Sequence, residues 1–282
     1  IAKDPTFALA YAGLADSYAV MSTFAAVPPR ESFPYARTAA LKALEIDETI
    51  GEAHAVLAEV NALYDMDWAG AERDFKRAIG LNPGYATARL WYGLFFARTG
   101  RFNEAFAEMK KAQELDPLSL IINSLVGWVY YQARRYDEAI EQLRQTLAMD
   151  PNFAYAHWVL GRTHMEKRMY PEAIAEFRAG LASGDPRFIA GLGHAYAVSG
   201  RQAEAQKILN ELLARSERGY FPSWVIATVY IGLGDKDQAF EWLGKAVEER
   251  GENVVWLKVG PLWDPLRSDP RFAGLLRRLN VP

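Results

Sequence analysis

The stretch GRFNEAFAEMKKAQELDP at residues 100–117 has two close copies farther along the chain. They read RRYDEAIEQLRQTLAMDP at 134–151 and RMYPEAIAEFRAGLASGDP at 168–186. A catalytic site needs one unique set of side chains, whereas a repeated segment is typical of a repeated architectural unit. Aligned on the alanine of EAF and EAI, the same slot recurs every 32 to 35 residues, at Ala36, Ala71, Ala105, Ala139, Ala173, Ala205 and Ala239.

One period contains two predicted helices. Ala105 and Met109 lie at i and i+4, on one face of the second helix. A second small residue, such as Gly93, lies 12 residues before most of the aligned alanines and lets the two helices approach closely. In the first two repeats the small residue is Ala15 and Ala58. The distance to the aligned alanine is nine residues longer after Ala15 and one residue longer after Ala58. Each unit is therefore predicted to be a helical hairpin, and stacked hairpins bury their apolar faces as a solenoid.

Capping residues mark the ends of the predicted helices. Asn103 is predicted to cap the second helix of its unit, and Asp67 to cap a helix that starts at Trp68. The pair Asp116-Pro117 ends a second helix, because the residue before proline disfavours the α conformation.

The pattern resembles the tetratricopeptide repeat, in which Leu-Gly, Tyr, Ala, Phe and Pro recur at set offsets. The matching residues are Leu160-Gly161, Ala173 and Phe177 in one unit, and Val126-Gly127, Tyr130, Ala139, Leu143 and Pro151 in another. The resemblance implies an all-α, right-handed solenoid of about seven hairpins with a C-terminal capping helix. The predicted divisions are 1–7 as the tail of a preceding repeat, seven repeats at 8–50, 51–85, 86–119, 120–153, 154–185, 186–219 and 220–253, and a cap at 254–282.

Three further stretches resemble the C-terminal repeat region of bacterial multidomain signalling proteins. They are DWAGAERDFKRAIGLNP, PLSLIINSLVGW and PLWDPLRSDPRFAGLLRRL. Those proteins carry a serine/threonine kinase, a nucleotide cyclase or a winged-helix domain upstream. The opening IAKDP fits the tail of a preceding second helix, so we expect the chain to be a fragment of such a protein.

Bulk composition narrows the choice of partner. The chain has 282 residues, half of them hydrophobic, with a formal net charge of −3 and no cysteine. Its basic residues are scattered and form no stripe that could follow a phosphate backbone, so no nucleic-acid partner is expected. The longest uncharged run, 219–234, has 16 residues and contains Pro222, which favours a buried helix over membrane insertion. No signal peptide is visible, and a cytoplasmic location is expected.

Local motifs give no support for catalysis, a cofactor or a metal. Asp65 to Gly70 begins like a calcium loop, but Ala69 and Lys76 occupy positions that need oxygen ligands. His157 and His164 are seven residues apart rather than the four of a helical zinc pair. The phosphate-binding and HExxH motifs are absent from the sequence. The segment is therefore predicted to be non-enzymatic, without catalytic, cofactor or metal residues.

The resemblance places partner-binding residues on the concave wall formed by the first helices, at positions two, five, nine, twelve and thirteen of each repeat. Aromatic residues and arginine are enriched at binding hot spots, and an apolar groove suits an extended or helical peptide. The Lys and Asn with which chaperone-binding members hold a C-terminal carboxylate are absent from positions five and nine. The alternative is that the aromatic residues pack between repeats. The predicted groove residues are Leu94, Trp128, Tyr131, Tyr155, Trp158, Arg162, His194 and Trp224.

The sequence therefore predicts a protein–protein interaction module, acting as sensor or scaffold for a parent signalling protein. Two alternatives stay open: an accessory region of a kinase or cyclase whose catalytic domain lies upstream, and a surface for homo-oligomerisation.

Two segments outside the regular repeats have predicted roles. Asp269 and Pro270 should start a last helix that runs to about Leu279 and covers the last hairpin with Phe272, Leu275, Leu276 and Leu279. In the insertion of the first repeat, Val27-Pro28-Pro29 should be extended, and Ser32 and Pro34 should lie near the start of the second helix. Phe24 and Phe33 are expected to pack on the first repeat, with a partner-binding loop as the alternative.

Overall fold

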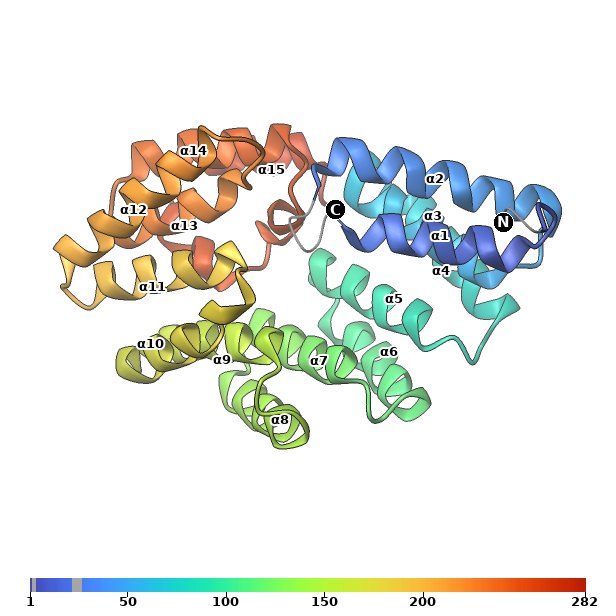
Figure 1. The fold of residues 1–282 in the computed structure, drawn as a ribbon, viewed down its shortest axis with the longest axis horizontal. Helices are drawn as coiled ribbons and strands as arrows, with labels where there is room; N and C mark the ends of the chain where they lie inside the picture. The colour runs from blue at the N-terminus through green and yellow to red at the C-terminus, as the bar shows by residue number, and fades with distance from the viewer. Residues whose placement is uncertain (2–3, 22–26) are drawn as a thin grey trace.

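The computed structural model describes residue 1, residues 4–21 and residues 27–282, and these residues form helices and turns without a strand. Seven helical hairpins follow one another along the chain (Figure 1). They are α1 Ala8–Met21 with α2 Pro29–Ile46, α3 Gly51–Val60 with α4 Trp68–Leu81, α5 Ala86–Thr99 with α6 Phe102–Leu115, α7 Leu120–Gln132 with α8 Tyr136–Met149, α9 Ala154–Glu166 with α10 Tyr170–Ala179, α11 Pro186–Val198 with α12 Gln202–Ser216, and α13 Ser223–Leu233 with α14 Lys236–Glu248. A last helix, α15, covers Pro270–Leu279. The predicted all-α solenoid is confirmed.

The small residues of the pattern bring the paired helices together. A Cβ added at Gly93 in α5 would lie 3.1 Å from the Met109 side chain of α6. A Cβ at Gly127 in α7 would lie 2.7 Å from Leu143 of α8. Between paired helices the chain turns sharply, as at Gly100, whose φ of 87° favours glycine. The hairpin is thus set by a small residue on one helix facing a large residue on the other.

The helix caps agree with the sequence in one case and differ in another. The Asp67 carboxylate accepts a hydrogen bond from the Gly70 backbone N–H at 2.9 Å and caps α4, as predicted. The prediction for Asn103 is wrong, because α6 begins one residue earlier, at Phe102. The residue before α6 is Arg101, whose Nε donates to Glu104 at 2.9 Å, and Asn103 lies inside the first turn.

The extra residue after Ala58 is absorbed by a change of helix type. Directly after α3, residues Asn61–Asp65 form a turn of π-helix, which takes up one more residue per turn than α-helix. Met66 then ends the helix with a φ of 58°. The π-helical turn therefore accommodates the extra residue, and α4 begins at the place that the repeat pattern expects.

The insertion in the first repeat lies partly outside the described residues, and Phe24 is among the residues not described. Pro28 is extended, with φ −60° and ψ 142°, as predicted. The prediction for Pro29 is wrong, because Pro29 is the first residue of α2, a position that suits the fixed φ of proline. Ser32 and Pro34 lie near the start of this helix, as predicted. Phe33 is buried and stacks on Tyr64 with ring centroids 5.6 Å apart, so this part of the insertion packs on the repeats.

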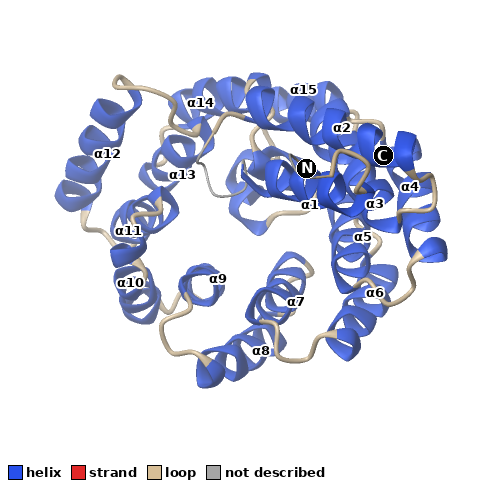
Figure 2. Ribbon diagram, turned by 45° about the vertical axis from the view of Figure 1, so that its right-hand side comes forward, coloured by secondary structure: helices blue, strands red, loops and turns tan. Residues whose placement is uncertain are grey.

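The hairpins curve into a ring whose inner wall carries the first helices (Figure 2). At the C-terminus, α15 begins as predicted, with Asp269 accepting a hydrogen bond from the Arg271 backbone N–H at 2.9 Å. Its Phe272, Leu275 and Leu279 are buried. The end of α15 also reaches the second repeat, because Trp68 Nε1 donates to the Leu279 carbonyl at 3.4 Å.

Candidate partner-binding surface

An aromatic cluster occupies the middle of the concave wall. The Trp128 ring of α7 stacks on the Trp158 ring of α9 with centroids 4.9 Å apart, and on Tyr131 at 5.1 Å. Arg162 donates to the Tyr131 hydroxyl at 2.8 Å. Burial raises the pKa of the Tyr131 hydroxyl well above its ordinary value, which keeps it neutral. First helices of neighbouring repeats are thus joined across their inner faces.

The chain's own C-terminal segment, residues 250–266, covers this cluster. After α14 the segment turns inward and forms two short 3₁₀ helices, η3 Glu252–Trp256 and η4 Pro261–Leu266. The Trp256 ring meets Trp128 edge-on, with centroids 5.6 Å apart. The Arg98 guanidinium of α5 also lies over the Trp256 ring, 5.4 Å from its centre. Arg98 is itself held by both carboxylate oxygens of Glu59, at 2.9 and 3.1 Å.

Polar contacts also attach the segment to the C-terminal ends of the same two first helices, α5 and α7. Lys258 Nζ donates to the Thr99 carbonyl at the end of α5, at 3.2 Å. Asp264 pairs with Arg134, after α7, at 3.0 Å. Within the segment's turn, Arg267 donates to the carbonyls of Lys258 and Gly260 at 2.8 and 2.9 Å. The segment therefore joins the end of the seventh repeat to the third and fourth repeats, which lie far from it in the sequence.

This occupant is packed into the concave wall through its apolar side chains. Its apolar side chains Val254, Val255, Trp256, Leu257, Leu262, Trp263 and Leu266 are all buried. Because the segment is tethered, it competes for the wall at an effective concentration on the order of millimolar. A separate peptide with the same contacts would also lose its translational freedom on binding. A partner therefore has to use concave surface that the segment leaves open.

The eight predicted groove residues fall into two groups. Six of them, Leu94, Trp128, Tyr131, Trp158, Arg162 and Trp224, are buried in the structure. Tyr155 and His194 keep partial solvent exposure. Burial of the His194 ring, with a smaller effect of the Arg162 charge, lowers its pKa to about 3, so it is neutral at pH 7. Packing between repeats accounts for the six buried residues, and the role of the set in partner binding stays a prediction.

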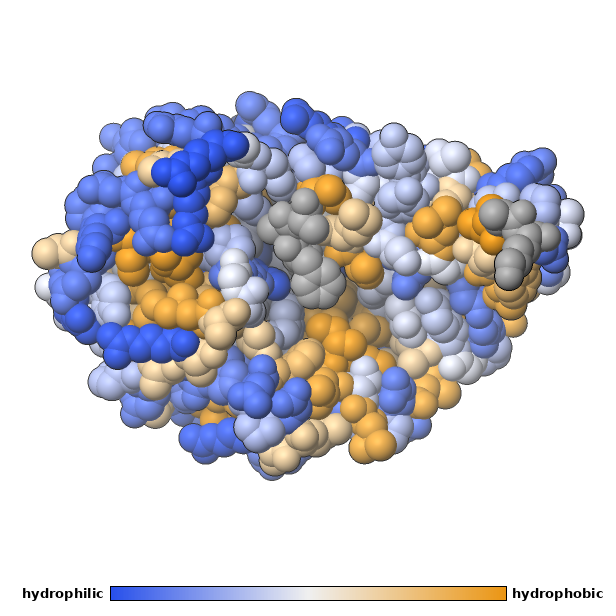
Figure 3. Space-filling model, viewed as in Figure 1, coloured by the Kyte–Doolittle hydropathy of each residue, from blue (hydrophilic) through white to orange (hydrophobic). Residues whose placement is uncertain are grey.

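One opening is a cavity of about 940 Å³ at the start of four first helices. Position two of repeats four to seven lines it, namely Ile121, Tyr155, Arg187 and Phe221. Val20 at the end of α1 lines it from the other side of the ring. Figure 3 shows hydrophobic residues just below the centre of this face of the molecule. We call this opening the position-two cavity.

The charged groups of the position-two cavity are already paired. Arg187 donates through Nε to the Asp185 carboxylate at 2.7 Å, and its guanidinium lies 5.1 Å from the centre of the Trp158 ring. Arg215 pairs with Glu211 at 2.5 Å. With its cations neutralised, the cavity suits an apolar segment better than an acidic one.

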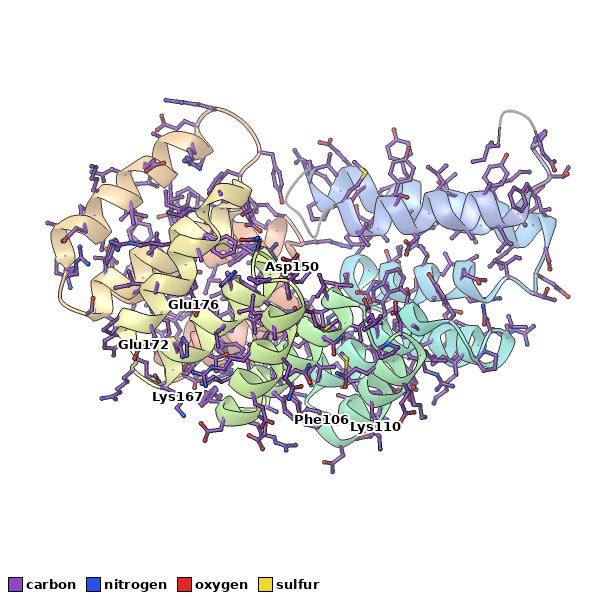
Figure 4. All side chains as sticks on the ribbon, turned by 60° about the horizontal axis from the view of Figure 1, so that its bottom comes forward. Phe106, Lys110, Asp150, Lys167, Glu172 and Glu176 are labelled. Atoms are coloured by element: carbon purple, nitrogen blue, oxygen red, sulfur yellow. The ribbon has the colours of Figure 1, made fainter. Side chains whose placement is uncertain are left out.

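Two histidines of α9 have opposite environments. His157 Nδ1 lies 2.6 Å from the Glu176 carboxylate, and this hydrogen bond raises the His157 pKa above its ordinary value. His164 is buried, and burial lowers its pKa. Glu172 and Glu176 lie together on one side of the molecule in Figure 4. Among the described residues no three His, Asp or Glu side chains gather as a metal site would require.

Comparison with known proteins identifies the family. A tetratricopeptide repeat model matches residues 57–119 and 127–186, and a second one matches residues 224–253. The chain belongs to the tetratricopeptide repeat family. These ranges cover more than half of its length, and no helix in the described part of this tetratricopeptide repeat chain is both long and apolar enough to cross a bilayer.

Solved tetratricopeptide structures share the fold at low sequence identity. PilF of Pseudomonas aeruginosa is 20% identical, covers 81% of this chain and 98% of its own, and gives a TM-score of 0.54. PilW, a type IV pilus biogenesis factor, is 18% identical, with 74% and 98% covered and a TM-score of 0.55. A chain of the APC/C hetero-tetramer Cut9-Hcn1 is 16% identical, with 88% and 49% covered and a TM-score of 0.58. No curated protein matches the sequence.

Sequence reasoning missed the C-terminal segment as an occupant of the concave wall. The run VVWLKVGPLW carries more large apolar residues than a cap over one hairpin requires, and this excess was the available signal. The apolar residues of the run indicate that it is buried, but they do not indicate on which surface it packs.

Proposed function

We propose that the chain is a protein–protein interaction module that binds an extended apolar peptide segment in the position-two cavity. The observation that carries the proposal is the repeated geometry of the lining. One position from each of four consecutive repeats faces the same cavity, so an extended ligand meets a side chain at each repeat. The cavity's size is within the range of known ligand sites.

A peptide-selection experiment tests this proposal. Peptides selected from a random display library on the full chain would be measured by calorimetry against two variants. Ile121→Asp places a charge on the lining at a residue that is 37% exposed, so the fold tolerates it. Leu118→Asp is the matched control, because Leu118 lies three residues earlier, is 77% exposed and lies outside the lining.

The proposal predicts that Ile121→Asp weakens binding of the selected peptides by about tenfold or more, since burying an unpaired charge costs well over 1.4 kcal/mol. Leu118→Asp should bind like the unmodified chain. Equal binding by both variants, or a library that yields no binder, would overturn it.

We further propose that the module serves a bacterial signalling or regulatory protein in the cytoplasm. The support is the resemblance of the three stretches quoted above to the repeat regions of such proteins. The alternative role, positioning substrate for an upstream kinase or cyclase domain, uses the same surface. The full gene sequence tests both, and a parent protein with neither an enzymatic nor a DNA-binding domain would refute the signalling proposal.

A further inference from the structure

The faces of the first helices that pack against the preceding repeat show a regular pattern of burial that the first repeat breaks. In repeats two to seven, positions three, six, seven and ten are buried, except for partly exposed Leu57 and Leu125. In α1 these positions are Ala10, Gly13, Leu14 and Ser17, and the last three are exposed. Position seven shows the difference clearly. Leu14 is 37% exposed, whereas its equivalents Tyr92, Val126, Leu160, Leu192 and Ile226 are buried.

Two glycines at position six show what normally covers this face. A Cβ added at Gly191 in α11 would lie 2.7 Å from the Phe177 ring, which belongs to α10, the second helix of the preceding repeat. A Cβ at Gly13 in α1 would meet no atom of the described residues within 4 Å. The same position is closely packed in one repeat and open in the other.

The turn that leads into α1 is built like the turns between repeats. The Thr6 backbone N–H donates to the Asp4 carboxylate at 2.9 Å, as the Asn152 N–H does to Asp150 at 2.9 Å. The Phe7 N–H donates to the Asp4 carbonyl at 3.4 Å, and the corresponding Phe153 bond is 3.2 Å. In the second case the turn connects α8 to α9, so this geometry leads from a second helix into a first helix.

The first repeat also differs from the others on its second helix, α2. Tyr35 is 61% exposed and stacks on Tyr18 of α1 with ring centroids 5.4 Å apart. The equivalents of Tyr35 in the later repeats are Gly70, Glu104, Glu138, Glu172, Glu204 and Gln238, which suit a solvent-facing surface. The first repeat therefore carries an aromatic residue where the others carry polar residues or glycine.

We propose that the outer face of α1, formed by Ala10, Gly13, Leu14 and Ser17, is a docking surface for one amphipathic helix. This helix is equivalent to the second helix of a preceding repeat, and the turn Asp4–Phe7 connects it to the start of α1. A large apolar side chain of the helix fills the space over Gly13, as Phe177 does over Gly191. The surface is separate from the position-two cavity, so peptide binding and helix docking can fail independently.

An extended chain tests this inference. Residues 67–81, which carry α4 with its own cap Asp67 and the core residue Phe75, are placed directly before Asp4, so that Asp4 takes the place of Asn82. If the surface accepts a helix, the extension raises Tm by about 4 °C or more, the shift expected for somewhat over 1 kcal/mol in a chain of this size. It also slows amide exchange in α1 by about tenfold or more.

Two substitutions decide whether the gain comes from the proposed face. Leu14→Asp should remove the Tm shift from the extended chain while changing the unextended chain by less than about 1 °C, since Leu14 is exposed there. Leu41→Asp, at a 52% exposed residue of α2 on a different face, should leave the shift intact.

The inference is overturned if the extension gives no Tm shift, or if the shift survives Leu14→Asp. It is also overturned if light scattering shows the unextended chain to be a dimer that Leu14→Asp dissociates, because the occupant would then be a second copy of the chain.

Discussion

The two ends of the solenoid are finished in different ways. At the C-terminal end, α15 buries Phe272, Leu275 and Leu279, and the C-terminal segment turns back into the ring. At the N-terminal end, Leu14 and Tyr35 lie exposed on the first hairpin. Each hairpin needs a neighbour to bury its apolar face, so the end of a solenoid requires a cover. Among the described residues, the last hairpin is covered by the C-terminal segment and α15, whereas the outer face of α1 is open.

Replacing Trp256 with alanine should have the largest effect. The ring is 4% exposed and packs against Trp128 and Arg98, so its removal leaves a cavity in the concave wall. We expect the free energy of unfolding to fall by about 3–5 kcal/mol in urea titrations. At the open end, Tyr35→Ala should change it by no more than about 0.5 kcal/mol. Similar losses of stability in Trp256→Ala and Tyr35→Ala would show that the two ends of the solenoid do not differ in this way.

The buried ion pair next to Trp256 should give the next largest effect. Glu59→Gln leaves the Arg98 charge buried without its carboxylate, and we expect a loss of about 3 kcal/mol. The double variant Glu59→Leu/Arg98→Met should lose less than the single one, because no charge remains in the wall. The exposed pair Arg135–Glu138 provides a control, in which Glu138→Gln costs at most about 1 kcal/mol. If Glu59→Gln is as stable as the control Glu138→Gln, the Glu59–Arg98 pair is exposed to solvent rather than buried.

The two glycines at position six should respond to alanine with opposite signs. Gly191→Ala forces a Cβ against the Phe177 ring and should destabilise the chain by about 1–3 kcal/mol. Gly13→Ala meets no described neighbour and improves helix propensity, so it should stabilise by about 0.5–1 kcal/mol. Chemical denaturation measures both, and a destabilising Gly13→Ala would mean that the outer face of α1 is already covered.

A smaller effect is expected in the dependence of stability on pH. Burial lowers the pKa of His164, so the unfolded chain binds a proton more readily, and stability falls as pH drops below about 6.5. His157 has the opposite sign. Its pKa is raised by Glu176, so its contribution is present below about 6.5 and is lost as pH rises through the folded pKa.

Urea midpoints between pH 5 and 8 separate the two histidines. His164→Leu should remove part of the loss of stability on the acid side, where His194 also contributes, and His157→Gln should flatten the loss on the alkaline side. An unchanged acid limb in His164→Leu would show that the ring is not sealed from solvent.

The features that sequence predicted are those set by neighbours close in the chain. The hairpins follow from local spacing, and the cap Asp67 and the last helix at Pro270 follow from local turn chemistry. The prediction that Asn103 caps α6 failed by two residues, because the helix begins at Phe102 and its N-cap position is Arg101. The aromatic positions of the concave wall were also found from spacing. What covers them could not be predicted, because Trp256 meets Trp128 across more than three repeats, and no local pattern encodes that contact.

Amide hydrogen exchange across residues 253–266 tests most directly the claim that the C-terminal segment is a permanent part of the concave wall. The account predicts that the hydrogen-bonded amides of this segment exchange only through global unfolding, as slowly as those of α7, and that adding a peptide selected for the position-two cavity leaves them unchanged. The amides of α1 should exchange faster, because its outer face is open. Exchange of the segment at the rate of α1, or exchange that speeds up when the peptide binds, would show that the segment leaves the wall and would contradict the account.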